Sequence, residues 1–598
     1  MSFQRVERGY WVWVALLACT ASAQTVNNQT LTGNYYFRQV SLGTDGASNL
    51  TDARSMIGTL TFDGTGHYTF SGQMAVGSGS PSSLSGNGAY SVDPAGFVSI
   101  DSPIRSGEKV NARYGAEAVV GSNTESSANT FDLFVAIPAP ATPATTSSLS
   151  GSYWAATLEF PGASLANARN TIFNFNASGT GTFTNFSVNG HAANLSAGQP
   201  TTQQVTGGTY TAAADGTITA NFGTATPTAL LSGTRTVYVS KGGNIVLGGS
   251  GSSHDILIAV KAISGATNAT WSGSFWGAGL RHDATTATGF AGSAIAGGAG
   301  KLIWTRRLKV LGVGNVDFTG VNSYSLNANG SGTAELAQIA LGTGGVFIGS
   351  EINPNDAAGY EIYCGVQMPA LSGTGLWINP QGVINPTSFS PTGNPISPGG
   401  FIRIYGAGFA TTSQSATPPY PPTLNGVTVL INNQPAAIYF VTPTTVDFVV
   451  PWATQGPTAT VVVQSGAKSS NTVTVPVAAT APGILSVQQN GTGPGVMQHA
   501  DYTTVTPDHP AVGGETVVIY VTGLGAVKRS VLVWNETLPA RIYRVALDGG
   551  RRELARELKS PDSAGILYGW LTLTTDGRFY LHRYRRALSS VNVVTFGR

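Results

Sequence analysis

Charged residues are scarce in this chain of 598 residues: Asp, Glu, Lys and Arg make up only 10%, against about 25% in a typical soluble domain. Coiled coils and helical bundles need these residues in quantity, so the composition excludes a mainly helical protein. The net charge of +2 gives no overall field suited to nucleic acid. With 41% hydrophobic residues the chain is not disordered, and its 77 glycines fit extracellular β-domains.

Cysteine is almost absent, with only Cys19 and Cys364 in the chain. If Cys19 is removed on export, no intrachain disulfide is possible, and stability must come from burial and strand pairing. Cys364 stands among strand-forming residues and is expected to be a small buried side chain, not a reactive thiol.

The only long apolar run of membrane type lies at the N-terminus, where residues 1–23 are predicted to be a signal peptide. Arg5 and Arg8 precede the apolar residues 10–18, which are too few to span a bilayer, and Ala21-Ser22-Ala23 forms a cleavage site. As an alternative, residues 16–19 resemble a bacterial lipobox, which implies lipidation of Cys19. Both interpretations predict an exported protein (extracellular, periplasmic or on the outer surface) with no transmembrane helix in the mature chain.

Motifs for catalysis and metal binding are also missing. The seven histidines form no His-x-x-x-His or His-Glu-x-x-His pattern, which excludes the usual zinc spacings. No Gly-x-Ser-x-Gly elbow, Walker loop or dinucleotide fingerprint occurs in a suitable context. We therefore expect no enzymatic activity, no catalytic residues, no cofactor and no metal; a hydrolase with scattered catalytic residues is the least favoured class.

What the sequence does contain is a repeat: four landmarks recur three times in one order. In the order of the units, they are the openings 31–36, 149–154 and 271–276; the turns Gly64–Gly66, Gly179–Gly181 and Gly298–Gly300; the pairs Tyr90 and Gly96, Tyr210 and Gly216, Tyr324 and Gly330; and the apolar strands Leu133–Ile137, Ile256–Val260 and Ile362–Val366. These landmarks predict three related units over residues 31–140, 149–265 and 271–370.

Short alternating runs joined by turns such as Asp63-Gly64 predict β-hairpins inside each unit. Eight or so such strands can close as a barrel or pack as a sandwich, and the sequence leaves both open. The opening of each unit is similar to avidin- and lipocalin-type barrels, a similarity that implies no ligand. Residues 301–309 form a locally basic stretch, expected to be a strand with a solvated edge and alternatively a binding patch.

A different pattern follows, with long motifs at residues 382–386, 396–409, 446–452 and 514–525. From residue 376 to about 527 the chain resembles the C-terminal domain of acidobacterial exported proteins, and residues 383–477 resemble a TIG/IPT immunoglobulin-like sandwich. The resemblance implies an accessory or spacer module without active residues. A second sandwich is expected to begin near residue 481 and to stop, truncated, at about 527.

The last segment, residues 528–598, is charged and basic, with 13 of the 31 Lys and Arg residues. Residues 542–554 and 571–580 resemble the last blade of a TolB-like propeller, which implies an orphan blade added by gene fusion. The alternative is that these strands complete the interrupted sandwich. The whole chain is therefore expected to be all-β: three antiparallel barrel or sandwich units, an immunoglobulin-like sandwich, a truncated second sandwich and a propeller-blade-like tail.

Repeated aromatic pairs at the head of each unit give the only hint of binding. Tyr36, Trp154 and Trp276 are candidates for stacking on sugar rings if they face solvent, although alternation places one residue of each pair in a core. The sequence thus predicts a non-enzymatic structural or adhesive protein of the cell surface or extracellular space, and alternatively a carbohydrate-binding protein. Polysaccharide or cell-surface components are the expected partners; nucleic acid is not.

Overall fold

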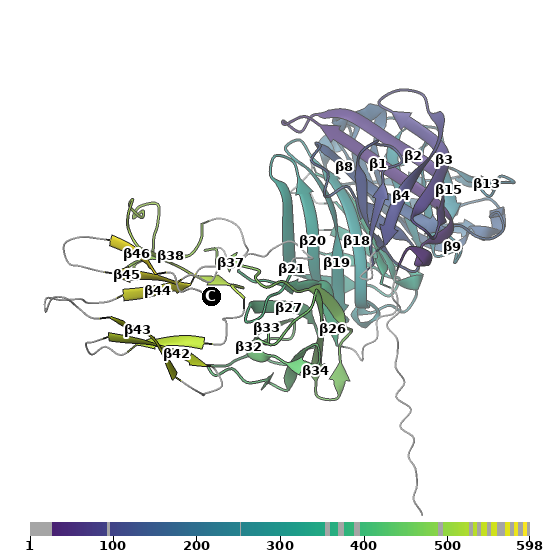
Figure 1. Cartoon of the computed structure of the whole chain (residues 1–598). Coiled ribbons are helices and arrows are strands. Elements are labelled where there is room, and N and C mark those ends of the chain that lie inside the picture. The colour runs from purple at the N-terminus through teal and green to yellow at the C-terminus, as the bar shows by residue number, and fades with distance from the viewer. Residues whose placement is uncertain are drawn as a thin grey trace, which may run out of the picture. The chain divides into compact units, whose positions relative to one another are not determined.

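The computed structural model describes residues 27–92, 96–251, 253–335, 337–352, 359–368, 376–387, 395–487 and 494–525, together with the backbone of six strands between residues 530 and 594 (Figure 1). The predicted signal peptide, with Cys19, lies outside the described residues. The elements described are β-strands and short 3-10 helices, which confirms the expected all-β class. The chain divides into two compact units, one with the three repeats and one with most of the remainder, and each is described by itself.

The first repeat is a closed barrel of eight antiparallel strands, in which each strand pairs with the next and the eighth returns to the first. Tight turns hold the hairpins: at Asp63-Gly64 the Asp63 carboxylate accepts backbone N–H groups of Thr65 and Gly66, and Gly64 has a φ of +77°. The strands, which follow η1 (Asn28–Thr30), are β1 (Thr32–Thr44), β2 (Leu50–Asp63), β3 (His67–Val76), β4 (Ser82–Val92), β5 (Phe97–Asp101), β6 (Lys109–Tyr114), β7 (Val119–Ser122) and β8 (Thr130–Pro138).

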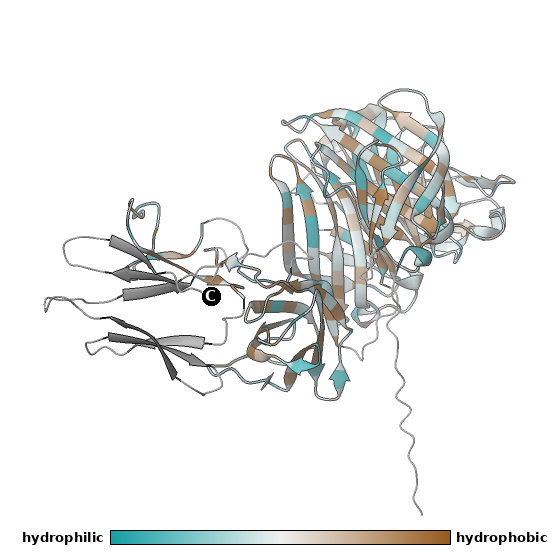
Figure 2. Cartoon of the chain, viewed as in Figure 1, coloured by the Kyte–Doolittle hydropathy of each residue, from teal (hydrophilic) through white to brown (hydrophobic). Residues whose placement is uncertain are grey.

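The third repeat closes in the same way, so barrel closure, which the sequence left open against a sandwich, is settled for both units. Figure 2 shows the alternation of hydrophobic and hydrophilic residues along these strands. The elements are η6 (Asn268–Thr270), β18 (Ser272–His282), β19 (Ala287–Gly297), β20 (Lys301–Val310), β21 (Gly314–Leu326), β22 (Ser331–Ala334), β23 (Ala337–Leu341), η7 (Thr343–Gly345), β24 (Val346–Glu351) and β25 (Tyr360–Gln367).

The second repeat is a sheet of nine strands in which the counterpart of β4 is broken in two around Gly207, which has a φ of +68°. A bridge joins Thr209, in one end strand of this sheet, to Thr182, in the connection between the strands that end at Ser178 and begin at Phe186. The elements are η2 (Thr146–Ser148), β9 (Ser150–Phe160), η3 (Pro161–Ala163), η4 (Leu165–Asn167), β10 (Arg169–Ser178), β11 (Phe186–Ala192), η5 (Ser196–Gly198), β12 (Thr201–Val205), β13 (Thr209–Ala212), β14 (Ile218–Asn221), β15 (Thr234–Val239), β16 (Ile245–Gly249) and β17 (His254–Lys261).

The repeated sequence landmarks close one end of each repeat. The phenol groups of Tyr90, Tyr210 and Tyr324 donate to the backbone carbonyls of the residues just before the first strands, over 2.8, 2.7 and 2.9 Å. In each repeat the turn glycines have positive φ, which a side chain would strain. The landmarks therefore recur for a structural reason: they anchor the start of the first strand over the end of the barrel.

The three repeats share one hydrophobic core, formed by the outer faces of their first and last strands. Strand β17 is buried at every residue from His254 to Val260, because one face lines its own repeat and the other packs on its neighbours. The shared core includes Val40, Leu42 and Val135 of the first repeat, Leu158, Ile256 and Ile258 of the second, and Leu280, Ile348 and Ile362 of the third. The three repeats therefore form one continuous block.

The following segment is built of two sheets, of five and six strands. Alternate residues of its strands are buried, and Asn432-Asn433 makes a tight turn with both residues at positive φ. The strands are β26 (Trp377–Ile384), β27 (Phe401–Ala407), β28 (Gln414–Ser415), β29 (Thr423–Leu424), β30 (Val427–Ile431), β31 (Gln434–Pro435), β32 (Ala437–Val441), β33 (Thr445–Val449), β34 (Thr458–Ser465), β35 (Lys468–Ser469) and β36 (Val473–Pro476).

Beyond residue 481 the strands are short and form two separate pairs. Strands β37 (Gly483–Ile484) and β40 (Val521–Thr522) form one pair, and β38 (Met497–His499) and β39 (Val517–Ile519) another. The tail forms two separate sheets of three strands: β41 (Ser530–Trp534), β42 (Ala540–Ala546) and β43 (Arg552–Leu558), then β44 (Gly569–Leu573), β45 (Phe579–Arg583) and β46 (Ser590–Val594). Its resemblance to a propeller blade stays a prediction.

Candidate functional site

The aromatic residues predicted to stack on sugars lie inside the block, between the repeats. Tyr36 stacks on Tyr238 with ring centroids 4.1 Å apart, and Trp276 packs edge-on against Phe97 at 5.7 Å. Trp154 packs against the shared core, and its indole N–H donates to the Asn329 carbonyl over 3.0 Å. Tyr36 and Trp276 therefore lack the exposure that stacking on a sugar requires, whereas Trp154 is half-buried and its stacking role stays a prediction.

Ionisable side chains gather instead near the far end of each first strand, away from the landmark tyrosines. The last strand of each repeat carries an acid at the same register position: Asp132, Asp255 and Glu361 lie directly opposite Ser41, Glu159 and Arg281 of the first strands. Alternation along a strand then fixes which neighbours point into the barrel. The side chains that surround this acid differ among the three repeats.

In the first two repeats an arginine fills this end. Arg105 donates to the Ser41 hydroxyl over 2.5 Å and pairs with Asp52 at 2.9 Å. In the second repeat Arg235 of β15 reaches both acids, Glu159 at 3.1 Å and Asp255 at 2.6 Å.

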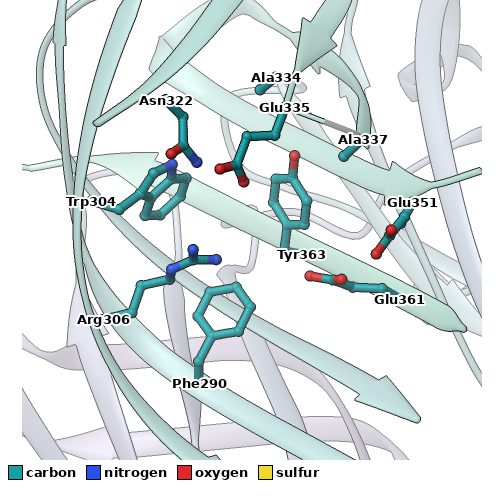
Figure 3. A pocket seen from close by; sticks show the side chains of 10 residues that line it. All are labelled: Phe290, Trp304, Arg306, Asn322, Ala334, Glu335, Ala337, Glu351, Glu361 and Tyr363. Atoms are coloured by element: carbon teal, nitrogen blue, oxygen red, sulfur yellow. The ribbon is translucent and has the colours of Figure 1, made fainter. Parts of the chain in front are cut away.

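In the third repeat the position of Arg235 is taken by Ala337. In the second repeat Arg235 lies two residues before Val237, which pairs with Gly248. In the third repeat Ala337 lies two residues before Ile339, which pairs with Gly349. A cavity of about 120 Å³ results, several times the roughly 10–15 Å³ that one water molecule needs. Figure 3 shows its lining side chains: Phe290, Trp304, Arg306, Asn322, Ala334, Glu335, Ala337, Glu351, Glu361 and Tyr363.

Two of the three carboxylates of the cavity lie close to one arginine of β18, which is not itself part of the lining. Arg281 pairs with Glu351 at 2.7 Å and approaches Glu361 at 3.8 Å. Burial, and then the neighbouring Glu351 carboxylate, raise the pKa of Glu361 to about 7. This side of the cavity is therefore a partly neutralised acid pair.

The other polar side chains of the cavity have no partner among the residues that the structure describes. The Nε of Arg306 is shielded from solvent without a hydrogen bond, and its guanidinium lies 5.2 to 5.5 Å from the rings of Phe290, Trp304 and Phe318. Asn322 and Tyr363 are 8% and 9% exposed, and their polar groups likewise lack a hydrogen-bond partner there. Glu335 points into the same space from the turn between β22 and β23 (Figure 3).

Strand β20 corrects one expectation from the sequence, since the basic stretch 301–309 is not a solvated edge. The strand pairs on both sides, with β19 and β21. Arg306 turns into the cavity, Arg307 pairs with Glu125 at 2.9 Å, and Lys309 donates to the Thr130 carbonyl over 2.8 Å. The sequence signalled unusual charge here, but not that one arginine of the run points into a barrel.

Over the described part of the chain, no group of three or more His, Cys, Asp or Glu side chains is arranged to hold a metal ion. The same residues include no helix long and apolar enough to cross a membrane.

Comparison with known proteins identifies one domain. An IPT/TIG domain lies at residues 385–491, which confirms the resemblance seen at residues 383–477. No curated protein matches the chain. Among solved structures, the H. pylori beta clamp in complex with 5-chloroisatin aligns with 56% of this chain and 92% of its own at 6% identity, with a TM-score of only 0.08.

Proposed function

We propose that this is an exported, non-enzymatic structural or adhesive protein of the cell surface or extracellular space. The observation that carries the proposal is the shared core: three repeats bury the outer faces of their first and last strands in one cluster. The burial of apolar surface between the repeats holds them together as one rigid block. The IPT/TIG domain that follows, a β-rich module of immunoglobulin type, suits the same role as a spacer or contact module.

Several features support export without testing it directly. Only 10% of the residues are charged, and the first 23 residues have the pattern of a signal peptide. Cys364 is a free thiol buried in the shared core. Carbohydrate binding through the three aromatics together is not proposed, because Tyr36 and Trp276 are covered by neighbouring repeats and only Trp154 keeps part of its surface exposed.

Deletion of the gene in the source organism tests the role. We expect intact cells of the parent strain to be labelled by antibody against the block, and the deletion strain to attach less to surfaces. Complementation by the full chain restores attachment, whereas a chain without residues 1–23 does not. Labelling only after cell lysis, or unchanged attachment, would overturn the proposal. Turnover of ester, glycoside or peptide substrates by the pure protein, abolished by one substitution, would contradict its non-enzymatic part.

A further inference from the structure

Four polar side chains without protein partners meet in the cavity of the third barrel: Arg306, Asn322, Glu335 and Tyr363. Asn322 and Tyr363 are more than nine-tenths buried. Buried polar groups in folded proteins are nearly always hydrogen-bonded, because an unpaired one loses its water without compensation. The Arg306 Nε lies in the cavity without such a bond, and the polar atoms of Asn322, Tyr363 and the exposed Glu335 are open there to water or to a bound molecule.

The charges around the cavity define what that molecule carries. The guanidinium of Arg306 stands among aromatic rings, with its Nε cut off from solvent and no carboxylate paired to it in the described residues. A guanidinium in this position matches a carboxylate, which accepts two parallel N–H donors. Glu351 pairs with Arg281 at 2.7 Å, and Glu361 lies 3.8 Å from Arg281, whose charge lowers the pKa of Glu361 more than that of Arg306 does.

Opposite charge is supplied by Glu335, whose carboxylate faces the cavity from the side away from Arg306 (Figure 3). It has no side-chain partner among the described residues, so it is free to accept from an ammonium group. The Tyr363 hydroxyl and the Asn322 amide lie on either side of the Glu335 carboxylate and supply a donor and a donor–acceptor pair. The apolar parts of Phe290, Trp304 and Ala337 complete the wall.

We infer that the third barrel binds a small zwitterion of the free amino acid type, with its carboxylate on Arg306 and its ammonium group on Glu335. The cavity of about 120 Å³ limits the ligand to a small molecule or the end of a larger one. The first two repeats lack this site because Arg105 and Arg235 fill the equivalent end with their own ion pairs. The site is thus a specialisation of one repeat, separate from the shared core.

Isothermal titration calorimetry on the full chain tests the inference with defined probes: L-alanine, L-serine and L-lysine. Each half of the alanine molecule serves as a comparison, with propionate lacking the ammonium group and ethylamine lacking the carboxylate. We expect at least one amino acid to bind at least tenfold more tightly than propionate and ethylamine. D-glucose tests a neutral ligand with many hydroxyl groups.

Variants then assign the binding to the cavity. Arg306→Gln and Glu335→Gln should each weaken amino acid binding at least tenfold, and Glu335→Gln keeps the fold because its side chain is exposed. Arg307→Gln and Glu125→Gln are the matched controls, since Arg307 follows Arg306 on the same strand but pairs with Glu125 outside the cavity lining, and binding should not change. Absence of amino acid binding, binding of glucose alone, or binding that both cavity variants leave unchanged would each overturn the inference.

Discussion

The guanidinium of Arg38 in the first repeat forms an ion pair with the carboxylate of Asp255 in the second, with a distance of 2.9 Å and both side chains at most 2% exposed. Arg38 also donates to the backbone carbonyls of Asp255 and Ser253, over 2.6 and 3.1 Å. Separation of the two repeats would leave this charge without its partners. The contact therefore joins neighbouring repeats by a buried charge that is hydrogen-bonded through its Nε and Nη2.

Replacement of Arg38 by methionine should destabilise the block by about 3 kcal/mol, since removing one partner of a buried ion pair leaves the other uncompensated. Asp255 retains Arg235 at 2.6 Å, so we expect a value at the lower end of the range for such changes. The free energy of unfolding from denaturant titration measures the effect. Arg54→Met is the control, because Arg54 pairs with Asp52 at the partly exposed rim and should cost less than about 1 kcal/mol. Equal losses in the two variants would contradict the buried contact.

Trp276→Ala should act on stability and not on sugar binding. Trp276 is 2% exposed and packs on Phe97, so its removal leaves a cavity between the first and third repeats that costs about 3–5 kcal/mol. Trp452→Ala, at an exposed position, should cost less than about 1 kcal/mol. Thermal unfolding and retention on insoluble polysaccharides measure both properties. A Trp276→Ala protein with unchanged stability that no longer binds polysaccharide would restore the stacking role rejected above.

Asp132 should make the block less stable as the pH rises from about 4 to about 6. Burial raises the pKa of this carboxyl to about 6, so in that interval the folded chain holds a proton that the unfolded chain has released. Stability falls where the folded state binds more protons, and the loss persists at neutral pH, by up to about 3 kcal/mol. Denaturant titrations between pH 4 and pH 8 measure this slope.

Asp132→Asn should remove that part of the slope and be at least as stable as the parent at pH 7. The Asn123 N–H can donate to the new amide oxygen as it does to Asp132, and the unpartnered Gln39 Oε1 can accept from the new amide nitrogen when the Gln39 amide turns over. Asp215→Asn provides the opposite sign, because backbone N–H donation from Thr217 lowers the Asp215 pKa. That variant should lose stability above pH 4. An unchanged slope in Asp132→Asn would refute the assignment.

Much of the fold could be predicted from the sequence, because local chemistry fixes it. The landmark glycines must adopt positive φ, and the alternating runs must bury one face, so three related β-units followed from these residues alone. Barrel and sandwich satisfy the same alternation, and only the pairing of the last strand with the first, as in Tyr36 with Ile137, distinguishes them.

The contacts between repeats could not be predicted from the hydrophobic pattern of single strands. Tyr36 and Trp276 alternate correctly with inward neighbours, yet their outward faces meet another repeat and not solvent. The continuous apolar run Ile256–Val260 did carry a signal, since a strand buried on both faces loses its alternation. The cavity could not be predicted from the sequence alone, because the equivalence of Ala337 with Arg235 depends on strand register.

Tyr210→Phe should weaken the closed end of the second repeat by about 1–2 kcal/mol, because the change leaves two backbone groups unsatisfied. The phenol oxygen donates to the Leu149 carbonyl over 2.7 Å and accepts the Gly179 N–H over 2.6 Å, and phenylalanine keeps the ring while removing both contacts. Tyr502→Phe, at an exposed position, is the control and should change stability by less than about 0.5 kcal/mol. Hydrogen exchange at the Gly179 amide should accelerate only in Tyr210→Phe, since its acceptor is lost. Unchanged exchange at that amide would show that the landmark tyrosine does not close the barrel end.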